Sequence, residues 1–238
     1  MYGERGKIGL IVPSNNTVVE QEVRCMLPDG LCSYATRMRN TAADPEDLQK
    51  MVAHAVRGAD ELATAEMDVI AFACTAGSLL HGSAWERDLR TRLETAASGI
   101  PCVTTSQAVL EAFGALGLRR LVVATPYIDE LNRAETEFFT ANGIQVGAIR
   151  GLGIRKAVDI GKCPPKEALD LALALPHQNA DGIFISCTNF RTIDILPELE
   201  RRTGKPAFSS NVATLWAALK RLPRPCGPVT GFGRLLLA

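Results

Sequence analysis

Two cysteines, each at the end of an apolar run, are the residues best placed to do chemistry. Cys74 closes DVIAFAC and Cys187 closes DGIFISC, and a threonine follows each of them. A lone cysteine in such a place is usually a small buried hydrophobe. A repeated Cys-Thr pair after matching runs favours a functional site instead. Backbone N–H groups and hydroxyls in the turns that follow would bind anionic oxygens and lower the pKa of the thiols.

Two thiols that face one small molecule suit chemistry at a carbon next to a carboxylate. One thiolate takes a proton or attacks carbon, while the other thiol gives a proton from the opposite face. Hydrogen-bond donors would stabilise the enediolate or aci-carboxylate that forms. Such a reaction needs no metal and no organic cofactor. In agreement, the sequence has no GxGxxG after a strand, no GxxxxGK[ST], no HxH, HExxH or CxxC, and only three histidines.

The segments around these cysteines predict an α/β fold. Short runs rich in Val and Ile, such as 7–13, 32–39, 68–74 and 118–126, alternate with longer amphipathic segments. This alternation predicts parallel sheets with helices on both faces. The continuous apolar run 68–74 is typical of a strand buried on both faces. Thr17 and Glu20 have capping-box spacing, which predicts a helix from there to about Leu27.

The second half of the chain repeats the first. IVP at 11–13 matches ATP at 124–126, and Cys74-Thr75 matches Cys187-Thr188, both at a separation of 113 positions (126 − 13 and 187 − 74). We therefore expect two pseudo-symmetric α/β halves, residues 1–113 and 114–238, with about 212–238 packing back on the first. Ligands of parallel sheets sit beyond the carboxyl ends of the strands. The active site is therefore predicted in the cleft between the halves.

Strand-end loops supply the other candidate residues of this cleft. Asn16 would hold a carboxylate through its amide N–H, and the phenol of Tyr127 would donate to the same or a second carboxylate. Turn chemistry is the alternative explanation for any single asparagine. Around catalytic Cys74 and Cys187, the predicted substrate-binding residues are Pro13, Ser14, Asn16, Thr75, Ala76, Tyr127, Asn132 and Thr188, and further polar candidates are Asn15, Asn189 and Asn211.

The composition of the chain argues against nucleic-acid binding, membrane insertion and secretion. Lys plus Arg (26) balances Asp plus Glu (26), so the chain has no electrostatic signature of nucleic-acid or anionic-membrane binding. It has no apolar run of membrane-spanning length and no signal-peptide pattern at its start. Seven cysteines without framework spacing predict reduced thiols and a cytoplasmic protein. A homodimer or higher homo-oligomer is the usual expectation for a soluble enzyme.

Several segments together resemble a known family. IGLIVPSNNTVVE, AFACTAGSLLHG, VVATPYIDELN, ISCTNF and GFGRLL are similar to the maleate cis–trans isomerases, which belong with the arylmalonate decarboxylases in the aspartate/glutamate racemase superfamily. The resemblance covers nearly the whole chain. It implies a cofactor-independent isomerase of two α/β halves, acting on a small dicarboxylate, and it suggests a dimer.

The resemblance also implies roles for single residues. Cys74 would add to the double bond of maleate and form a succinyl-cysteine-like intermediate, in which rotation about a single bond leads to fumarate. Cys187 would supply and recover the proton. Asn16 and Tyr127 match positions that contact carboxylates, and backbone donors at Thr75 and Thr188 would complete the anion sites.

Other activities remain open. Arylmalonate decarboxylases keep only the second cysteine, so two thiols favour an isomerase, or a racemase in which both cysteines act as bases. A related decarboxylase and a non-catalytic binding protein are further alternatives. Some maleate isomerases have a substrate-binding asparagine where this chain has Ala157. The second carboxylate would then be held otherwise, for example by Arg155, or the substrate would not be maleate.

Overall fold

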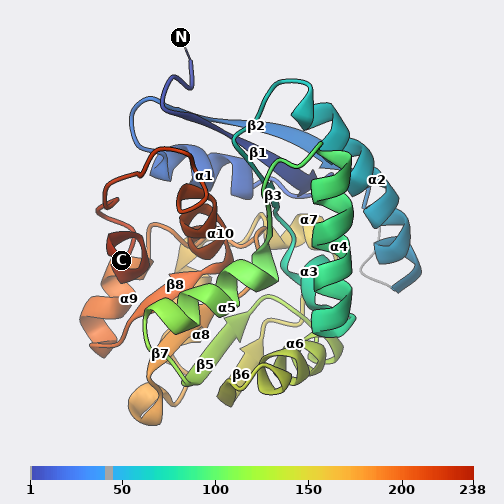
Figure 1. The fold of residues 1–238 in the computed structure, drawn as a ribbon. Helices are drawn as coiled ribbons and strands as arrows, with labels where there is room; N and C mark the ends of the chain where they lie inside the picture. The colour runs from blue at the N-terminus through green and yellow to red at the C-terminus, as the bar shows by residue number, and fades with distance from the viewer. Residues whose placement is uncertain (1, 41–44) are drawn as a thin grey trace.

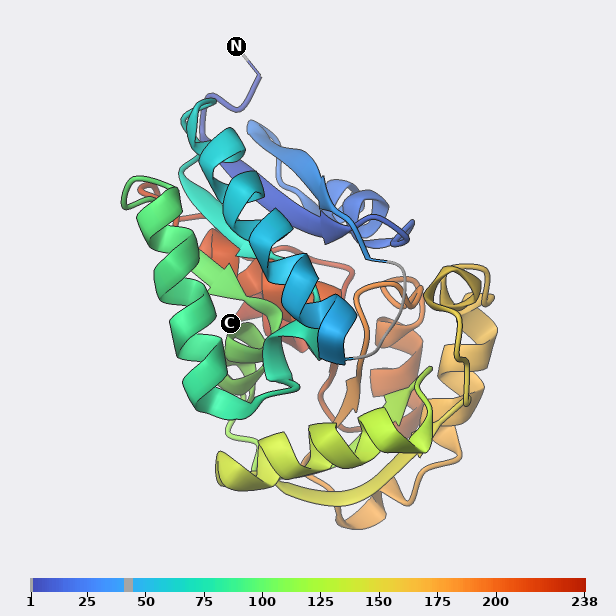
Figure 2. The ribbon, with the colours of Figure 1, turned by 90° about the vertical axis from the view of Figure 1, so that its right-hand side faces the viewer.

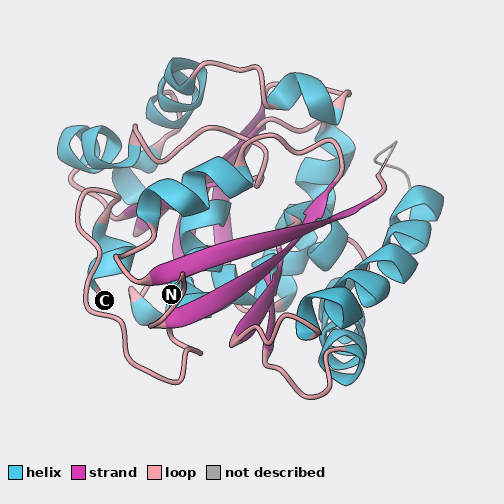
Figure 3. Ribbon diagram, turned by 90° about the horizontal axis from the view of Figure 1, so that it is seen from above, coloured by secondary structure: helices cyan, strands magenta, loops and turns pink. Residues whose placement is uncertain are grey.

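The computed structural model describes residues 2–40 and 45–238, which form two four-stranded parallel sheets (Figures 1 and 3). The strand order of the first sheet is β2-β1-β3-β4 and that of the second is β6-β5-β7-β8. The strands are β1 (Gly6–Pro13), β2 (Leu31–Met38), β3 (Val69–Phe72), β4 (Cys102–Thr104), β5 (Arg120–Thr125), β6 (Gln145–Gly151), β7 (Gly182–Ile185) and β8 (Ala207–Ser209). The same order in both sheets confirms the predicted α/β fold with two similar halves.

Helices surround both sheets (Figure 2). They are α1 (Val19–Met26), α2 (Pro45–Ala63), α3 (Thr75–Leu79), α4 (Gly82–Ala96), α5 (Thr105–Ala115), α6 (Asp129–Ala141), α7 (Ala157–Ile160), α8 (Pro165–Leu173), α9 (Leu196–Thr203) and α10 (Ser210–Leu219), with 3₁₀ turns at His177–Asn179 and Arg234–Leu237. None of the helices in the described part of the chain is long and apolar enough to cross a membrane.

Helices α5 and α10 pack together between the two sheets. Helix α10 also contacts α1, β3 and β4 of the first sheet, although it follows β8 in the sequence. Phe113 of α5 packs edge-on against Phe184 of β7 and in a tilted arrangement against Phe208 of β8, with ring centroids 5.7 and 5.4 Å apart. All three rings are buried, and each contributes on the order of 2 kcal/mol by leaving water. The core is therefore continuous between the two sheets. The division of the chain at residue 113 stays a proposal.

The central strands confirm the reading of their sequence. Every residue of β3 and β7 is buried, as a continuously apolar run predicts for a strand covered on both faces. Both strands end just before a cysteine. The carboxyl ends of β1, β3, β5 and β7 are therefore the places where loops can build a site.

The first helix starts differently from the prediction. Val18 is the N-cap of α1, and no side-chain hydrogen bond forms at that residue. Asn16 replaces the predicted capping box, because its Oδ1 accepts hydrogen bonds from the N–H groups of Val18 and Val19 at 2.9 and 3.1 Å. Glu20 instead pairs with Arg37 at 2.6 Å. The short helices α3 and α7 were also not separate elements of the prediction, since they lack the length that periodicity needs.

Candidate active site

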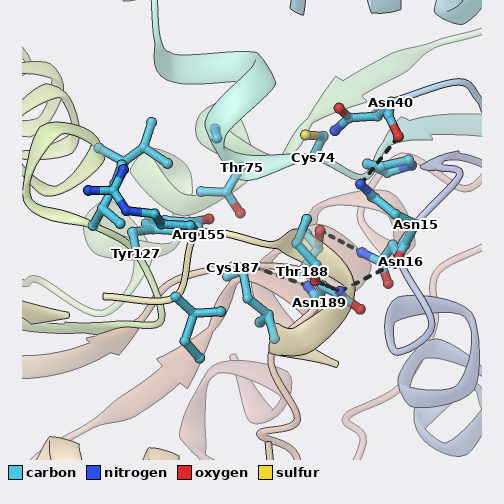
Figure 4. Close-up of a pocket in the computed structure, with 17 residues that line it drawn as sticks. Asn15, Asn16, Asn40, Cys74, Thr75, Tyr127, Arg155, Cys187, Thr188 and Asn189 are labelled. Carbon is cyan, nitrogen blue, oxygen red and sulfur yellow. Dashed lines mark hydrogen bonds between the residues drawn. The ribbon is translucent and has the colours of Figure 1, made fainter. Parts of the chain in front are cut away.

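A cavity lies where the carboxyl ends of the two sheets face each other, and residues from both halves line it (Figure 4). Both Cys74 and Cys187 line it, and each residue is only 7 % exposed. The whole lining consists of Pro13, Asn15, Asn16, Asn40, Cys74, Thr75, Ala76, Tyr127, Ile128, Leu131, Ile154, Arg155, Ala157, Ile160, Cys187, Thr188 and Asn189. The structure therefore brings the two thiols, which are 113 positions apart in the sequence, into one cavity.

Cys74 sits at the N-cap position of α3, two residues after the end of β3. Its carbonyl accepts a hydrogen bond from the hydroxyl of Ser78 at 2.8 Å, which fixes the turn. Gly77 faces the thiol, and a Cβ at that position would lie 3.1 Å from the sulfur and 2.5 Å from the methyl group of Met51. Only glycine therefore lets this turn of α3 approach the sulfur closely.

Cys187 has a strained backbone. Its φ is +94°, one of three positive values among the non-glycine residues that the structure describes. Such a conformation costs about 1–3 kcal/mol and is found where function requires a fixed geometry. The N–H of Asn189 donates to the Cys187 sulfur at 3.4 Å. The strained turn thus aims one backbone donor at the thiol.

The two cysteine loops are tied to each other. The Ser210 hydroxyl, at the start of α10, accepts hydrogen bonds from the Thr75 hydroxyl at 2.9 Å and from the Cys187 N–H at 3.0 Å. The Thr188 hydroxyl donates to the Ala73 carbonyl at 3.0 Å. All of these contacts are buried. The positions of the thiols relative to each other are therefore set by hydrogen bonds as well as by packing.

Asn16 joins the loop after β1 to the loop after β7. Its Nδ2 donates to the Thr188 hydroxyl at 3.0 Å, while its Oδ1 caps α1. An amide nitrogen carries two N–H donors, so one N–H of Asn16 is left for a ligand in the cavity. Arg37 supports the loop, because its guanidinium donates to the carbonyls of Ser14 and Asn16 at 3.2 and 2.8 Å.

Burial changes the acidity of both thiols in the direction opposite to our prediction. It raises the pKa of Cys74 from 9.0 to about 11, although the Gly77 N–H acts against the shift. It raises the pKa of Cys187 to about 12, against the opposing effect of the Tyr127 hydroxyl and the Asn189 N–H. The prediction of lowered thiol pKa values was wrong, because two backbone donors do not offset the loss of water in a closed cavity.

The acidity of Cys74 gives a testable prediction. Because its pKa lies above neutral, the thiolate fraction should rise about tenfold per pH unit between pH 7 and 9. Alkylation of Cys74 by iodoacetamide, followed by site-resolved mass spectrometry, should accelerate accordingly. Protein unfolded in urea is the control, where Cys74 should react faster at pH 7 than in the folded chain. Fast alkylation of the folded protein that does not change over this pH range would contradict a buried, protonated thiol.

Eight of the ten predicted residues line the cavity, and two do not. Asn132 is buried and does not line the cavity, and its Oδ1 accepts a hydrogen bond from the Thr125 hydroxyl at 2.6 Å. Ser14 is exposed, and its hydroxyl pairs with the backbone of Asn40. Tyr127 does line the cavity, and its own N–H donates to the Thr125 hydroxyl at 3.1 Å.

Five residues that line the cavity were not predicted from the sequence. Asn40 follows the end of β2, so the rule that ligands bind at strand ends would have found it. The other missed residues are apolar, so no polar signal marks them, and they lie just before α6, on α6, on α7 and in the loop between β6 and α7: Ile128, Leu131, Ile160 and Ile154. Asn15, Asn16 and Asn40 lie on one side of the cavity, and Arg155 and Tyr127 lie on the opposite side (Figure 4).

The residues that the structure describes include no cluster of three or more His, Cys, Asp or Glu side chains with the arrangement of a metal site. All seven cysteines are unpaired. The polar groups of the cavity are amides, hydroxyls, two thiols and the Arg155 guanidinium. Donors of this kind suit an organic anion better than a metal ion.

The chain is similar to known proteins over nearly its whole length. A model of the arylmalonate decarboxylase family matches residues 8–236. Arylmalonate decarboxylase of Bordetella bronchiseptica is 32% identical over 232 residues, which cover 96% of this chain and 95% of the relative. A crystal structure of a Pseudomonas putida maleate isomerase mutant with maleate has a TM-score of 0.93 and 27% identity, covering 98% of this chain and 97% of its own.

Maleate cis–trans isomerase of Nocardia farcinica, in a cysteine-to-serine mutant with a covalently bound succinylcysteine intermediate, has a TM-score of 0.91 and 26% identity. That match covers 97% of this chain and 98% of the neighbour. The sequence and structural matches thus extend over nearly the whole length of both chains. With the matched family model, they show that the chain belongs to the arylmalonate decarboxylase family.

Proposed function

We propose that the protein catalyses the cofactor-independent cis–trans isomerisation of a small unsaturated dicarboxylate, with maleate converted to fumarate. The observation that carries the proposal is that Cys74 and Cys187 line one cavity from two different sheets. Support comes from a similar isomerase that binds maleate and from another that carries a succinylcysteine intermediate.

The reaction would proceed by addition and elimination. The Cys74 thiolate forms a bond to one olefinic carbon, and the π electrons move to the other carbon, which takes the proton of the Cys187 thiol. The former double bond is then a single bond and rotates. The Cys187 thiolate removes a proton from the same carbon, the double bond re-forms, and the C–S electron pair returns to Cys74. No atom or electron is gained or lost overall.

Both carboxylates need partners in the cavity. We assign the first to the free N–H of Asn16, the Tyr127 phenol and the backbone N–H groups of Thr75 and Thr188. Arg155 is our candidate for the second, because it lines the cavity and makes no ion pair with any residue that the structure describes. Ala157, which lines the same wall, has no polar side-chain atom to share this task.

Replacement of Arg155 by alanine is expected to raise KM for maleate more than it lowers kcat. A hydrogen bond between charged groups contributes about 1.5–3 kcal/mol, so KM should rise about 10- to 100-fold. The matched control is Lys156→Ala, which removes a neighbouring exposed cation that does not line the cavity. Steady-state kinetics with both variants test this assignment, and an unchanged KM in Arg155→Ala would remove Arg155 from the substrate site.

A decarboxylase is the second candidate, because the matched family model is that of the arylmalonate decarboxylases. One thiol is enough to protonate the carbanion that loss of CO₂ leaves. Decarboxylation therefore gives no role to Cys74, which occupies a constrained turn in the same cavity. The presence of both thiols favours isomerisation over decarboxylation.

Proton NMR of the purified protein in deuterated buffer tests the proposal against its alternatives. Incubation with maleate should replace its olefinic signal by that of fumarate, in the presence of a metal chelator and without added cofactor. Incorporation of deuterium at the α-carbon of an amino acid would indicate a racemase, and release of CO₂ from an arylmalonate would indicate a decarboxylase. Binding of these compounds without any turnover would indicate a binding protein.

A further inference from the structure

A buried carboxyl group outside the cavity holds the loop that carries Cys187. Glu22 of α1 is buried and is not one of the lining residues. Its Oε1 accepts hydrogen bonds from the N–H groups of Thr192 and Ile193 at 2.5 and 3.2 Å. Its Oε2 accepts one from the Thr192 hydroxyl at 3.3 Å and one from Nδ2 of Asn211 at 2.7 Å. The loop after β7 is therefore fastened to α1, which packs on β2 of the first sheet.

Asn211 of α10 connects Glu22 to the residue that follows Cys187. Its Nδ2 donates a hydrogen bond to the Thr188 carbonyl at 3.1 Å as well as to Glu22. A carbonyl oxygen can only accept, which fixes the orientation of the Asn211 amide. The Oδ1 of Asn211 is buried and has no hydrogen-bond partner among the described residues, which is costly. Asn211 therefore acts here through its two N–H groups, and it does not line the cavity.

The Thr188 carbonyl and the Asn189 N–H belong to one peptide unit. The described part of the chain has no cis peptide bond, so the C=O and the N–H of this unit point in opposite directions. The carbonyl points to Asn211, and the N–H donates to the Cys187 sulfur at 3.4 Å (Figure 4). The orientation of one peptide plane therefore decides whether the Cys187 sulfur has its backbone donor.

We propose that Glu22 is a positioning residue for Cys187, and that it acts through Asn211 on the peptide between Thr188 and Asn189. This inference rests on the proposed function, in which Cys187 gives a proton to the substrate and later removes it. Loss of the proton leaves a thiolate, and the Asn189 N–H stabilises that charge. Cys187 has a φ of +94°, a conformation that persists only where the surrounding structure enforces it. Glu22 supplies fixed acceptors at both ends of this turn.

The hydrogen bonds of Glu22 suit a carboxylate in this role. Burial raises the pKa of Glu22, and the hydrogen bonds from Asn211, Thr192 and Ile193 act against that shift. Three of the four donors are N–H groups, which cannot accept a proton from a carboxylic acid. Glutamine has the same shape, but it has one acceptor oxygen and no charge. Glu22→Gln therefore tests the acceptors without leaving a cavity.

Glu22→Gln is expected to lower kcat for maleate about tenfold and to change KM less than about threefold. The glutamine oxygen keeps the N–H groups of Thr192 and Ile193, while its NH₂ group faces that of Asn211, which then turns and releases the Thr188 carbonyl. Tenfold is the lower end for a hydrogen bond to a charged group, because sulfur is a weak acceptor. Steady-state kinetics measure the effect, after thermal unfolding has shown that the variant is folded at the assay temperature.

Asn211→Leu interrupts the same connection from the other side. It removes both N–H donors and leaves Glu22 bonded to Thr192 and Ile193. We expect kcat to fall about as much as in Glu22→Gln, and the double variant to lose no more than either single one, because both substitutions release the same peptide. Independent losses that multiply in the double variant would contradict a connection through Asn211.

Glu200→Gln is the matched control for a purely structural effect. Glu200 is another buried carboxyl group, and its Oε1 accepts hydrogen bonds from the N–H groups of Ala207 and Arg234 at 2.9 and 3.1 Å, outside the cavity lining. This variant should lose stability and keep the kcat of the wild type. Wild-type kcat in Glu22→Gln, or equal losses of kcat in Glu22→Gln and Glu200→Gln, would overturn the proposal.

Hydrogen exchange of single amides, followed by NMR, gives a readout that does not depend on turnover. The Asn189 amide should exchange at least about tenfold faster in Glu22→Gln than in the wild type, and at the wild-type rate in Glu200→Gln. If maleate is not converted but this difference is present, the proposed function fails while the hold of Glu22 on the Asn189 amide stands. If maleate is converted and the exchange of Asn189 is unchanged in Glu22→Gln, the positioning role is refuted and the isomerase is not.

Discussion

Replacement of Cys74 by alanine is expected to lower kcat/KM for maleate at least about a thousandfold, the scale typical of losing a covalent nucleophile. Without its sulfur no bond to the olefinic carbon forms, and the barrier to rotation about the double bond remains. The other groups of the cavity still bind the dicarboxylate. KM should therefore change much less than kcat, and the measurement is steady-state kinetics followed by NMR or fumarate absorbance.

Cys102→Ala is the matched control for Cys74→Ala. Cys102 is also buried and also lies in the first sheet, but it does not line the cavity. The truncation should lower the free energy of unfolding by about 1 kcal/mol and leave turnover close to that of the wild type. Activity retained by Cys74→Ala would show that the thiol packs rather than reacts.

Replacement of Cys187 by serine is expected to have the second large effect on turnover, a fall in kcat. The hydroxyl of serine is a much weaker acid than a thiol, so the carbon next to the C–S bond would lose its proton donor. General acid–base catalysis contributes about 10²- to 10⁴-fold, and kcat should fall within that range. Cys163→Ser, which alters a buried thiol outside the cavity lining, serves as the control. A Cys187→Ser variant with wild-type kcat would assign the proton to another group.

The comparison of the wild type with Cys187→Ser separates the effect of the sulfur from the effect of the strained backbone at this position. Serine and cysteine share the same Cβ, so both residues bear the same backbone strain at φ +94°. A change in activity then reports on the sulfur and not on the turn. Thermal unfolding of the two proteins should accordingly give similar midpoints.

The sequence was enough to predict the fold and the placement of the Cys74 and Cys187 thiols in one cavity. The motifs at strand ends, repeated at equal spacing, predicted both features, because parallel strands that end at one edge of a sheet bring their loops together. Val-Ile runs such as those of β3 and β7 marked the buried strands correctly. These features depend on local pattern, which is the part of folding that a single sequence records directly.

Contacts between distant segments could not be predicted in the same way. The Ser210 hydroxyl accepts hydrogen bonds from both Thr75 and Cys187. Ser210 lies 135 positions after Thr75 and 23 positions after Cys187, and no spacing in the sequence indicates that it contacts both. The raised pKa values of the thiols follow from closure of the cavity, which depends on the packing of both halves. For the same reason, apolar lining residues such as Ile154 carried no signal, since an isoleucine in a loop resembles any other packing residue.

The central claim is that Cys74 and Cys187 act on one substrate from opposite sides of a shared cavity. Mass spectrometry of the Cys187→Ser variant after prolonged incubation with maleate tests it most directly, because an adduct that forms slowly with a proton from water has no Cys187 thiolate to reverse it and should accumulate. We expect the intact mass to increase by one molecule of the diacid, and tandem spectra to place the increase on Cys74. An unmodified Cys74, or modification spread over exposed thiols such as Cys25 at the same rate as in unfolded protein, would contradict the claim.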